Sequence, residues 1–289
     1  MTLANLDNSI SIVTAFYDLG RANWKGFERS VDYYFNNFAR LAQLENEMVV
    51  YVASEEHKER VLALRGNRKT EVVIYDLFKE QADLVQRVKA VLENPEYKSK
   101  VKPELLENGN IEYFNAEYDV VNFAKTLFIN HAIENNLVSH EQVAWVDFGY
   151  HRNKKFCKNI SEWRFAFTPD KINFFNVIKA KRIPPFNTEE QIFRFMYENI
   201  VYIVGCIIVG NRKAWQEFNQ LLYPIIDELL ARNIIDDDQG VYMYCVHKKP
   251  ELFKINYVGK RWRIQNIVNN YNDQTLRAKV FQFWQKIKG

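Results

Sequence analysis

The stretch VAWVDFGYHR, residues 143–152, decides the expected fold. Its apolar part lacks the alternation of a half-exposed strand, which predicts a strand buried on both faces of a parallel sheet. The run ends at Asp147, followed by Phe148 and Gly149. In open α/β sheets ligands bind beyond the carboxyl ends of the strands, where an acid can hold a divalent cation and a glycine lets a bulky ligand approach the backbone. Such a site suits phosphate chemistry; the alternative is that Asp147 only caps a turn.

Strand and helix patterns alternate on the N-terminal side of this stretch. Strands are expected at residues 11–17, 47–52 and 71–75, and helices at residues 31–44, 55–64 and 119–134. This β-α-β-α-β order implies a mostly parallel sheet with right-handed crossovers. The predicted fold class is therefore α/β, with a mostly parallel central sheet flanked by helices.

Other segments depart from this regular order. Residues 75–110 are helical and charged and contain proline breakers, which predicts a surface insertion. Residues 154–185 hold short aromatic runs and predict a smaller irregular lobe beside the site. The apolar run at residues 200–209, interrupted by Gly205, predicts a strand or a pair of strands, and a helix follows at residues 215–230.

The composition is that of a folded globular protein. Of 289 residues, 47% are hydrophobic and 26% are charged, with only ten Gly and seven Pro. The formal net charge of +3 is too small to indicate a nucleic-acid partner. The longest apolar run is far shorter than the roughly 20 residues of a membrane-spanning helix, and the first residues lack the features of a signal peptide.

The cysteines indicate a reducing compartment. Cys157, Cys206 and Cys245 are odd in number and widely spaced, so they fit neither a disulfide framework nor a zinc site. We therefore expect a cytoplasmic protein.

A second polar group is formed by three consecutive acids, Asp236 to Asp238, and Gln239. One interpretation is a capped helix, because carboxylates accept hydrogen bonds from the free amides of a helix start and face its positive dipole end. The other is that one acid, chiefly Asp238, points into the cleft and binds or deprotonates a hydroxyl.

The C-terminal part is basic and aromatic. Its loop VGK around Lys260 can bring cations against an anionic leaving group, although most basic loops are only solvated. A helix expected at residues 275–288 carries lysines beside aromatic residues, which suits the edge of an anionic membrane; the alternative is a helix that packs onto the domain. The other basic residues of this part are Lys248, Lys249, Lys254, Arg261 and Arg263.

Taken in order, these pieces resemble a glycosyltransferase of the GT-A kind. That pattern has an N-terminal strand that carries the nucleotide, a helix, an apolar strand ending in an Asp-x-Asp metal motif, a glycine-bearing strand, a helix and an acidic segment with a glutamine. More closely, the chain resembles the HtrL/YibB-type bacterial family of glycosyltransferase-like proteins. The resemblance is carried by SIVTAFYDLGR (11–21), EYFNAEYDVVNFAKTLFI (112–129), AWVDFGY (144–150), VGCIIVGNRKAW (204–215) and DDDQGVYMYCVHKKPELF (236–253).

The resemblance implies one GT-A-like domain over residues 1–289, with a nucleotide-binding half at about residues 9–152 and an acceptor-binding half at about residues 153–289. It implies hexosyltransferase-like transfer of a sugar from a nucleotide-diphosphate donor to a hydroxyl of a glycan or glycolipid. The acceptor would belong to lipopolysaccharide or another bacterial surface glycan. The protein would then be cytoplasmic, with peripheral contact with the inner membrane through its basic C-terminus.

The resemblance also assigns roles to residues. Tyr17 would stack on the base, Arg21 would pair with a phosphate, and Asp147 would be the metal ligand. Asp238 would align or deprotonate the acceptor, and Asp237 would be the second candidate for this role. Gln239 would contact sugar hydroxyls. The donor-binding residues implied are Thr14, Ala15, Phe16, Tyr17, Arg21, Lys125, Gly205 and Lys260.

One position departs from the GT-A pattern. Gly149 stands where the metal motif has its second acid. Mn²⁺ or Mg²⁺, the cofactor implied, would keep only Asp147 of the motif, with His247 or Asn256 as weak candidates for a remote ligand. Lys125 and Lys260 would then carry part of the positive charge.

Two alternative classes remain. A nucleotidyltransferase of similar fold normally has a Gly-rich basic loop after its first strand, where this chain has only Gly20 and Arg21. A non-catalytic carbohydrate-binding protein would keep the fold without turnover, and the missing second acid favours that class.

Overall fold

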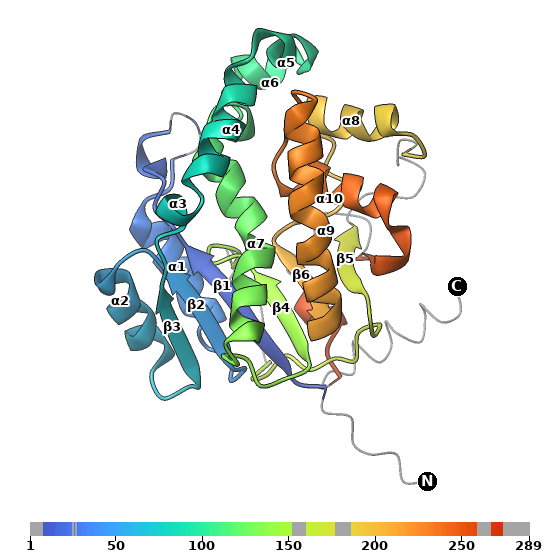
Figure 1. The fold of residues 1–289 in the computed structure, drawn as a ribbon. Coiled ribbons are helices and arrows are strands. Elements are labelled where there is room, and N and C mark those ends of the chain that lie inside the picture. Colours follow the sequence, from blue (N-terminus) through green and yellow to red (C-terminus); the bar gives the residue numbers. More distant parts are fainter. Residues whose placement is uncertain are drawn as a thin grey trace.

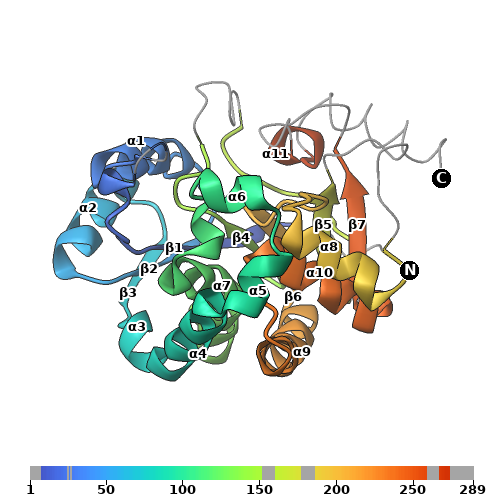
Figure 2. The same cartoon turned by 90° about the horizontal axis from the view of Figure 1, so that it is seen from above.

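A seven-stranded sheet runs through the centre of the molecule (Figures 1 and 2). The computed structural model describes residues 8–24, 26, 28–151, 160–176, 186–258 and 267–273. The strands are β1 (Ile10–Phe16), β2 (Met48–Val52), β3 (Thr70–Ile74), β4 (Gln142–Val146), β5 (Ile172–Asn176), β6 (Ile207–Asn211) and β7 (Phe253–Tyr257). The α-helices are α1 (Val31–Leu41), α2 (Glu55–Arg65), α3 (Leu77–Glu80), α4 (Ala82–Glu93), α5 (Pro95–Lys100), α6 (Pro103–Glu107), α7 (Ala116–Glu134), α8 (Glu189–Tyr197), α9 (Arg212–Ala231), α10 (Asp238–Lys248) and α11 (Ile267–Asn270), and the 3-10 helices are η1 (Arg21–Asn23), η2 (Ile111–Tyr113) and η4 (Pro250–Leu252).

The sheet is mostly parallel, as the sequence predicts. Its order is β3-β2-β1-β4-β6-β5-β7. The strands β3, β2, β1 and β4 pair in parallel, as do β5 and β7, whereas β6 is antiparallel to both of its neighbours. The elements also follow the order of the GT-A pattern, namely β1, the long helix α7, β4, β6, α9 and the acidic start of α10. The fold is therefore α/β and GT-A-like in this order.

Both faces of the sheet are covered by helices. Seen from above, α4, α7 and α9 lie on one side of the sheet and α1 and α11 on the other (Figure 2). Side chains of β1 alternate between the two resulting cores: Val13 packs with the α7 side, and Ile10 and Ile12 pack with the α1 side. This double coverage explains why the strands carry continuous apolar runs rather than alternating ones.

Local sequence signals fix where several helices begin. The hydroxyl oxygen of Ser30 accepts a hydrogen bond from the Tyr33 amide at the start of α1, and Ser54 caps α2 through the His57 amide. Thr188 and Gln191 form a reciprocal capping box at the start of α8. These caps satisfy amides that have no partner within the helix.

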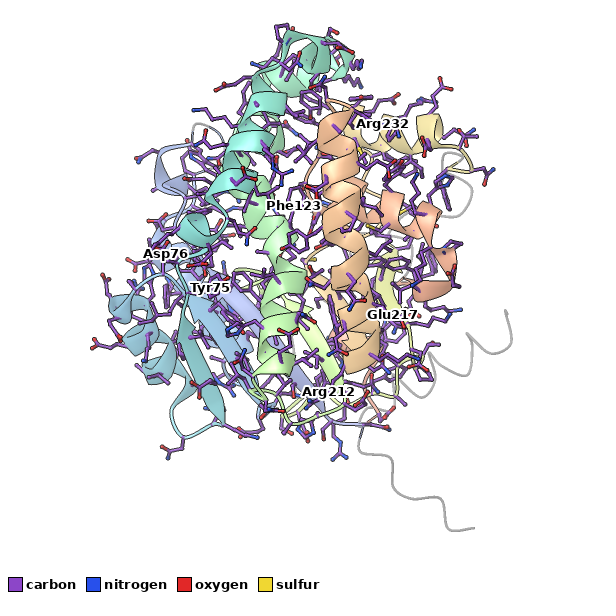
Figure 3. The ribbon with its side chains drawn as sticks, viewed as in Figure 1. Tyr75, Asp76, Phe123, Arg212, Glu217 and Arg232 are labelled. Carbon is purple, nitrogen blue, oxygen red and sulfur yellow. The ribbon has the colours of Figure 1, made fainter. Side chains whose placement is uncertain are left out.

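Helix α9 is anchored to other parts of the fold at both ends (Figure 3). At its start, the Arg212 guanidinium donates to the Val138 and His140 carbonyl oxygens in the loop before β4. At its end, Arg232 contacts Glu189 of α8 at 2.9 Å. Helix α9 therefore connects the loop before β4 to helix α8.

Three sequence-based expectations about the fold need correction. Of residues 200–209, only residues 207–209 belong to β6, because a turn at Gly205 precedes the strand. The segment expected to be an irregular lobe contains β5, a strand inside the sheet, and its residues 160–167 cover the α1 side. The insertion at residues 75–110 is helical as predicted, but α4 buries Leu84 and Val88 in the core that it shares with α7.

Part of the C-terminal expectation lies outside the described residues. This holds for Lys260, Arg261, Arg263 and the helix expected at residues 275–288. Among the residues that are described, no helix is both long enough and apolar enough to cross a membrane.

Candidate active site

A pocket of about 460 Å³ opens at the carboxyl edge of the parallel strands. Its walls come from the ends of β1 and β4, the turn before β6, one face of α7 and the start of α10. Because β6 runs antiparallel to β4, its first residues lie at the same edge where β4 ends, and the Asp147 amide donates to the Cys206 carbonyl at 2.9 Å. The volume is typical of small-ligand sites.

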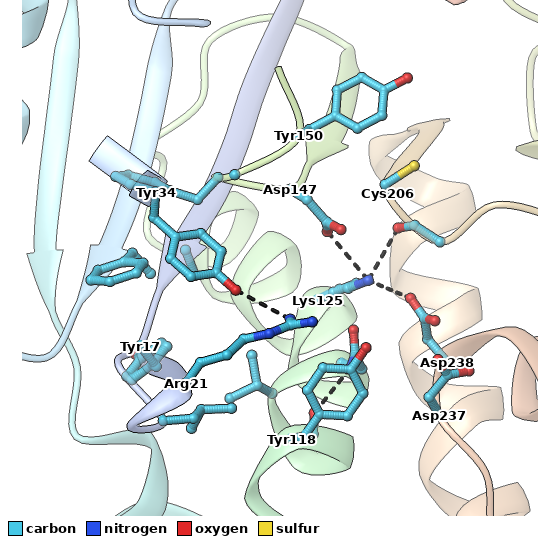
Figure 4. A pocket seen from close by; sticks show the side chains of 18 of the residues that line it. Tyr17, Arg21, Tyr34, Tyr118, Lys125, Asp147, Tyr150, Cys206, Asp237 and Asp238 are labelled. Atoms are coloured by element: carbon cyan, nitrogen blue, oxygen red, sulfur yellow. Dashed lines mark hydrogen bonds and ion pairs between the residues drawn. The ribbon is translucent and has the colours of Figure 1, made fainter. Parts of the chain in front are cut away.

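The ammonium group of Lys125 lies at the centre of the pocket wall (Figure 4). It donates to the Gly205 carbonyl at 3.1 Å and to a carboxylate oxygen of Asp238, and it lies 3.3 Å from Asp147 Oδ1. The side chains of Lys125 and Asp238 are only 4% and 3% exposed, whereas that of Asp147 is 38% exposed. Asp147 is therefore the most exposed member of this group.

Burial and charge set the protonation of these groups. Burial opposes the charged form of Lys125, but Asp147 and Asp238 outweigh it and raise its pKa above the usual value. Burial raises the pKa of Asp238, and the ammonium of Lys125 opposes that shift. A lysine fixed between two carboxylates keeps its charge, because opposite charges nearby favour the ionised form.

The consecutive acids serve two purposes at once. Asp237 is the N-cap of α10 and accepts from the Gln239 amide at 3.0 Å. Asp238, the first residue of the helix, points at Lys125. The capped helix and the acid that points into the cleft, which the sequence left as alternatives, therefore both occur on adjacent residues.

Gly205 is required by the close approach of Asp238. A Cβ atom at Gly205 would lie 1.9 Å from Asp238 Oδ2 and 2.5 Å from its Cγ. The absence of a side chain therefore lets the carboxylate reach the lysine beside the Gly205 carbonyl.

Gly149 is also explained by a close neighbour, and the neighbour is not a ligand. A Cβ atom there would lie 2.5 Å from Cδ1 of Tyr34. The Tyr34 hydroxyl oxygen in turn accepts from Arg21 Nη1 at 3.2 Å. The expectation that Gly149 makes room for a ligand is corrected accordingly, since the ring of a residue in α1 already fills that space.

Most of the predicted site residues meet in this pocket. The predicted residues that line it are Ala15, Phe16, Tyr17, Arg21, Lys125, Asp147, Gly205, Asp237, Asp238 and Gln239. Thr14 lies outside it, fully buried inside β1 between β2 and β4. His247 and Asn256 are likewise absent from the lining.

Tyr17 is less available for stacking than the sequence suggests. One face of its ring is covered by Phe128, with ring centroids 5.8 Å apart and planes within 9°. Its hydroxyl donates to the Tyr75 carbonyl at 2.9 Å. The side chain is 8% exposed, so the ring is held in the core and offers only an edge to the pocket.

Several lining residues were not found from the sequence. Trp24 and Arg29 line the pocket from the segment between β1 and α1, Tyr34 lines it from α1, and Tyr118 and Asn122 line it from α7. The α7 residues carried a usable signal, because they precede Lys125 by seven and three positions and so share its helix face. The loop residues carried no such signal.

A group of buried acids lies behind the pocket. Asp119 is fully buried, and neither of its carboxylate oxygens has a hydrogen-bond partner among the described residues. Burial raises its pKa well above the usual value, and the charges of Asp237 and Glu112 raise it further. Burial likewise raises the pKa of Asp236 well above its usual value.

These raised pKa values predict that stability falls as pH rises above the ordinary range of an aspartate. The folded state then binds more protons than the unfolded state, whose aspartates titrate near about pH 3.9, so raising the pH favours unfolding. Asp119→Asn cannot ionise and should reduce this slope, measured as urea unfolding at several pH values. Asp83→Asn, at an exposed aspartate, is the matched control and should leave the slope unchanged. Equal slopes in all three proteins would contradict a buried titrating Asp119.

The site residues do not fit a divalent ion held by protein side chains alone. Among the described residues, no group of three or more His, Cys, Asp or Glu side chains is placed to hold a metal. Between the carboxylates of Asp147 and Asp238 the space is taken by the Lys125 ammonium. Hard cations such as Mg²⁺ need several oxygen ligands, which this arrangement does not offer.

The fold and the pocket define an α/β protein with a charged pocket at the carboxyl edge of its parallel strands. Residues 8–266 match the family described as "Bacterial protein of unknown function (HtrL_YibB)". The chain is 36% identical over 283 residues to Protein HtrL of Escherichia coli (strain K12), covering 95% of this chain and 96% of that protein. The chain therefore belongs to the HtrL_YibB family, as the sequence resemblance indicated.

Two solved structures show a distant likeness. Mouse xyloside xylosyltransferase 1, in its apo form, has a TM-score of 0.40 and 13% identity, with 85% of this chain and 84% of that chain covered. The apo-form glycosyltransferase GlyE of Streptococcus pneumoniae has a TM-score of 0.39 and 9% identity, with 97% of this chain and 64% of that chain covered. At these scores the likeness is too distant to assign a shared activity.

Proposed function

We propose that this protein is a glycosyltransferase that moves a sugar from a nucleotide-diphosphate donor to a hydroxyl acceptor. The observation that supports it best is the convergence of Asp147, Lys125 and Asp238 in one pocket at the carboxyl edge of the sheet. Asp147 directly follows β4, Lys125 lies in α7 and Asp238 begins α10, so only the folded chain unites them. A site of facing acids and cations suits a reaction in which a phosphate departs while a positive sugar centre forms.

The donor would bind in the N-terminal half, at about residues 9–152. The end of β1 supplies Ala15, Phe16 and the edge of Tyr17 as a wall for the nucleoside. The guanidinium of Arg21 provides a planar pair of donors that match phosphate oxygens. The acceptor would enter from the side built by about residues 153–289, where Gln239 lines the pocket beside Asp238.

Asp238 is proposed to align and deprotonate the acceptor. In this step the acceptor oxygen forms a bond to the anomeric carbon, and the bond from that carbon to the diphosphate oxygen breaks. The hydroxyl proton passes to the carboxylate, and the diphosphate leaves with the electron pair. General-base catalysis of this kind contributes about 10²- to 10⁴-fold to a rate. Asp237, fixed as the helix cap, would hold the start of α10 in place.

Two other functions make different predictions. A nucleotidyltransferase would attack a phosphate, but the first strand here is followed by Gly20 and Arg21 without a Gly-rich loop. A nucleotide-sugar or carbohydrate-binding protein without turnover is favoured by one observation, namely that Lys125 already neutralises charge on both acids of the pocket. Turnover of the donor separates the three classes.

The acceptor is proposed to be a glycan or glycolipid of the bacterial surface, with peripheral membrane contact through the C-terminus. In the described part of the basic stretch, Lys248 contacts Glu189 at 2.7 Å and Lys249 contacts Glu217 at 3.2 Å. Contact with anionic lipid would therefore depend on Lys254, which is exposed in β7, and on the basic residues that follow that strand.

A nucleoside diphosphate should raise the melting temperature of the purified protein. A ligand that binds only the folded state adds about 2.7 kcal/mol of stability at a hundred times its dissociation constant. The measurement is a thermal-shift panel of nucleoside diphosphates and nucleotide sugars, followed by an assay of donor hydrolysis. If no nucleotide shifts the melting temperature, the proposed donor class is wrong. A shift without sugar release or transfer would support the binding protein instead.

A further inference from the structure

The side chains of Lys125 and Arg21 bring positive charge into the pocket. We propose that it works without a bound divalent cation, because Lys125 and Tyr34 fill the positions that a metal ion and a second acidic ligand would need, and that Lys125 and Arg21 supply the positive charge facing an anionic ligand. The role of these cations toward a departing phosphate rests on the proposed function. The exclusion of the metal ion does not.

Lys125 takes the position between the two acids. Its ammonium group donates to the Gly205 carbonyl at 3.1 Å and to Asp238 Oδ2, and it forms an ion pair with Asp147 Oδ1 at 3.3 Å. The group is buried, since its side chain is only 4% exposed, and its two carboxylate neighbours hold it between them. A divalent ion could reach Asp147 only from the open side of the pocket, with one carboxylate as ligand and a like charge behind it.

Tyr34 takes the position of a second acid. In an Asp-x-Asp arrangement the second carboxylate would start at residue 149, but a Cβ atom there would lie 2.5 Å and 2.8 Å from Cδ1 and Cε1 of Tyr34. An acidic side chain at this position would therefore displace the ring. The Tyr34 hydroxyl oxygen instead accepts from Arg21 Nη1 at 3.2 Å, so the space of a second ligand is used to hold a cation.

The two cations lie on facing sides of the pocket. Figure 4 shows the guanidinium of Arg21 extending toward the side on which Lys125 meets Asp147 and Asp238. Arg21 also lies over the ring of Trp24, 5.3 Å from its centroid, which fixes its direction. The guanidinium and the ammonium group are both cations, so they provide a positive field where an anion would sit.

The test is a titration of the metal-stripped full-length protein with Mn²⁺. Electron paramagnetic resonance measures the signal of the free ion. The titration is done with and without UDP, the nucleotide used as the probe. The native protein should leave the free Mn²⁺ signal unchanged, and adding UDP should lower it no more than UDP does alone. Lys125→Ala opens the gap between Asp147 and Asp238 and should bind about one Mn²⁺ per chain. Lys125→Met removes the same charge but fills the gap, so it is the matched control and should bind none.

Three results would overturn the proposal. The first is Mn²⁺ binding by the native protein that Asp147→Asn abolishes, either alone or with UDP. The second is a folded Lys125→Ala variant that binds no Mn²⁺, since the lysine would then not occupy a cation position. The third is equal binding by the Ala and Met variants. If the Ala variant does not fold, the comparison of the native protein with Asp147→Asn still decides. Failure of every nucleotide to bind would count against the proposed function and leave the metal result untouched.

Discussion

Lys125→Met should lower the free energy of unfolding by about 3–5 kcal/mol, the usual cost of removing one partner from a buried ion pair. The lysine side chain is 4% exposed and Asp238 is 3% exposed, so the carboxylate left behind could not regain its lost interactions from water. The Gly205 carbonyl would lose its donor as well. The measurement is urea unfolding followed by circular dichroism. The loss should be smaller at about pH 5 than at about pH 8, because protonation removes the unpaired charge of Asp238.

An exposed pair provides the control for this prediction. Lys100 contacts Glu96 at 2.8 Å within α5, at the surface, so Lys100→Met removes the same chemical group without leaving a buried charge. Its unfolding curve should be nearly that of the native protein. If Lys125→Met and Lys100→Met unfold alike, the buried ion pair does not contribute to the stability of the fold.

Asp238→Asn should reduce turnover of the donor and acceptor pair by about 10²- to 10⁴-fold, the range of a general base. The amide keeps the shape of the carboxylate and can still accept from Lys125, so the pocket should remain formed. Binding of a nucleoside diphosphate should be unchanged or tighter, because a negative charge is removed. A fall in kcat with intact binding would mark an interaction used in the transition state.

The neighbouring residue supplies the matched comparison. Asn is as good a helix cap as Asp, so Asp237→Asn keeps the start of α10 while it removes one half-buried carboxyl. Its effect on turnover should be clearly smaller than that of Asp238→Asn. Equal losses in both variants, or a matching fall in melting temperature for Asp238→Asn, would mean that Asp238 is only structural.

The sequence alone determined the elements and the edge at which the site lies. The apolar run before Asp147 predicted β4, and the helical spacing at residues 119–134 predicted most of α7. These predictions succeed because strand and helix periodicity depend on neighbours within a few residues. The acids before Gln239 predicted a helix start for the same reason, and Asp237 is that cap.

Some expectations about single residues failed because the sequence of a buried strand does not indicate which of its side chains reach the pocket. Every residue of β1 except Ala15 is buried, so no alternation indicated that the Thr14 side chain would be fully buried and would not reach the pocket. The stacking partner of Tyr17 is Phe128 of α7, far away in the sequence. A fully covered strand hides which side chains reach its edge.

Only the tertiary structure decided the charge arrangement of the site. The antiparallel direction of β6 brings Gly205 and Cys206 beside Asp147. The contact between Lys125 and Asp238 joins residues 113 positions apart, and it forms because α7 and α10 converge at the sheet edge where Gly205 leaves room. Such contacts depend on how packed elements fit together, which local periodicity does not encode. The sequence therefore supplied the acids and the lysine, and packing placed the lysine where a metal ion was expected.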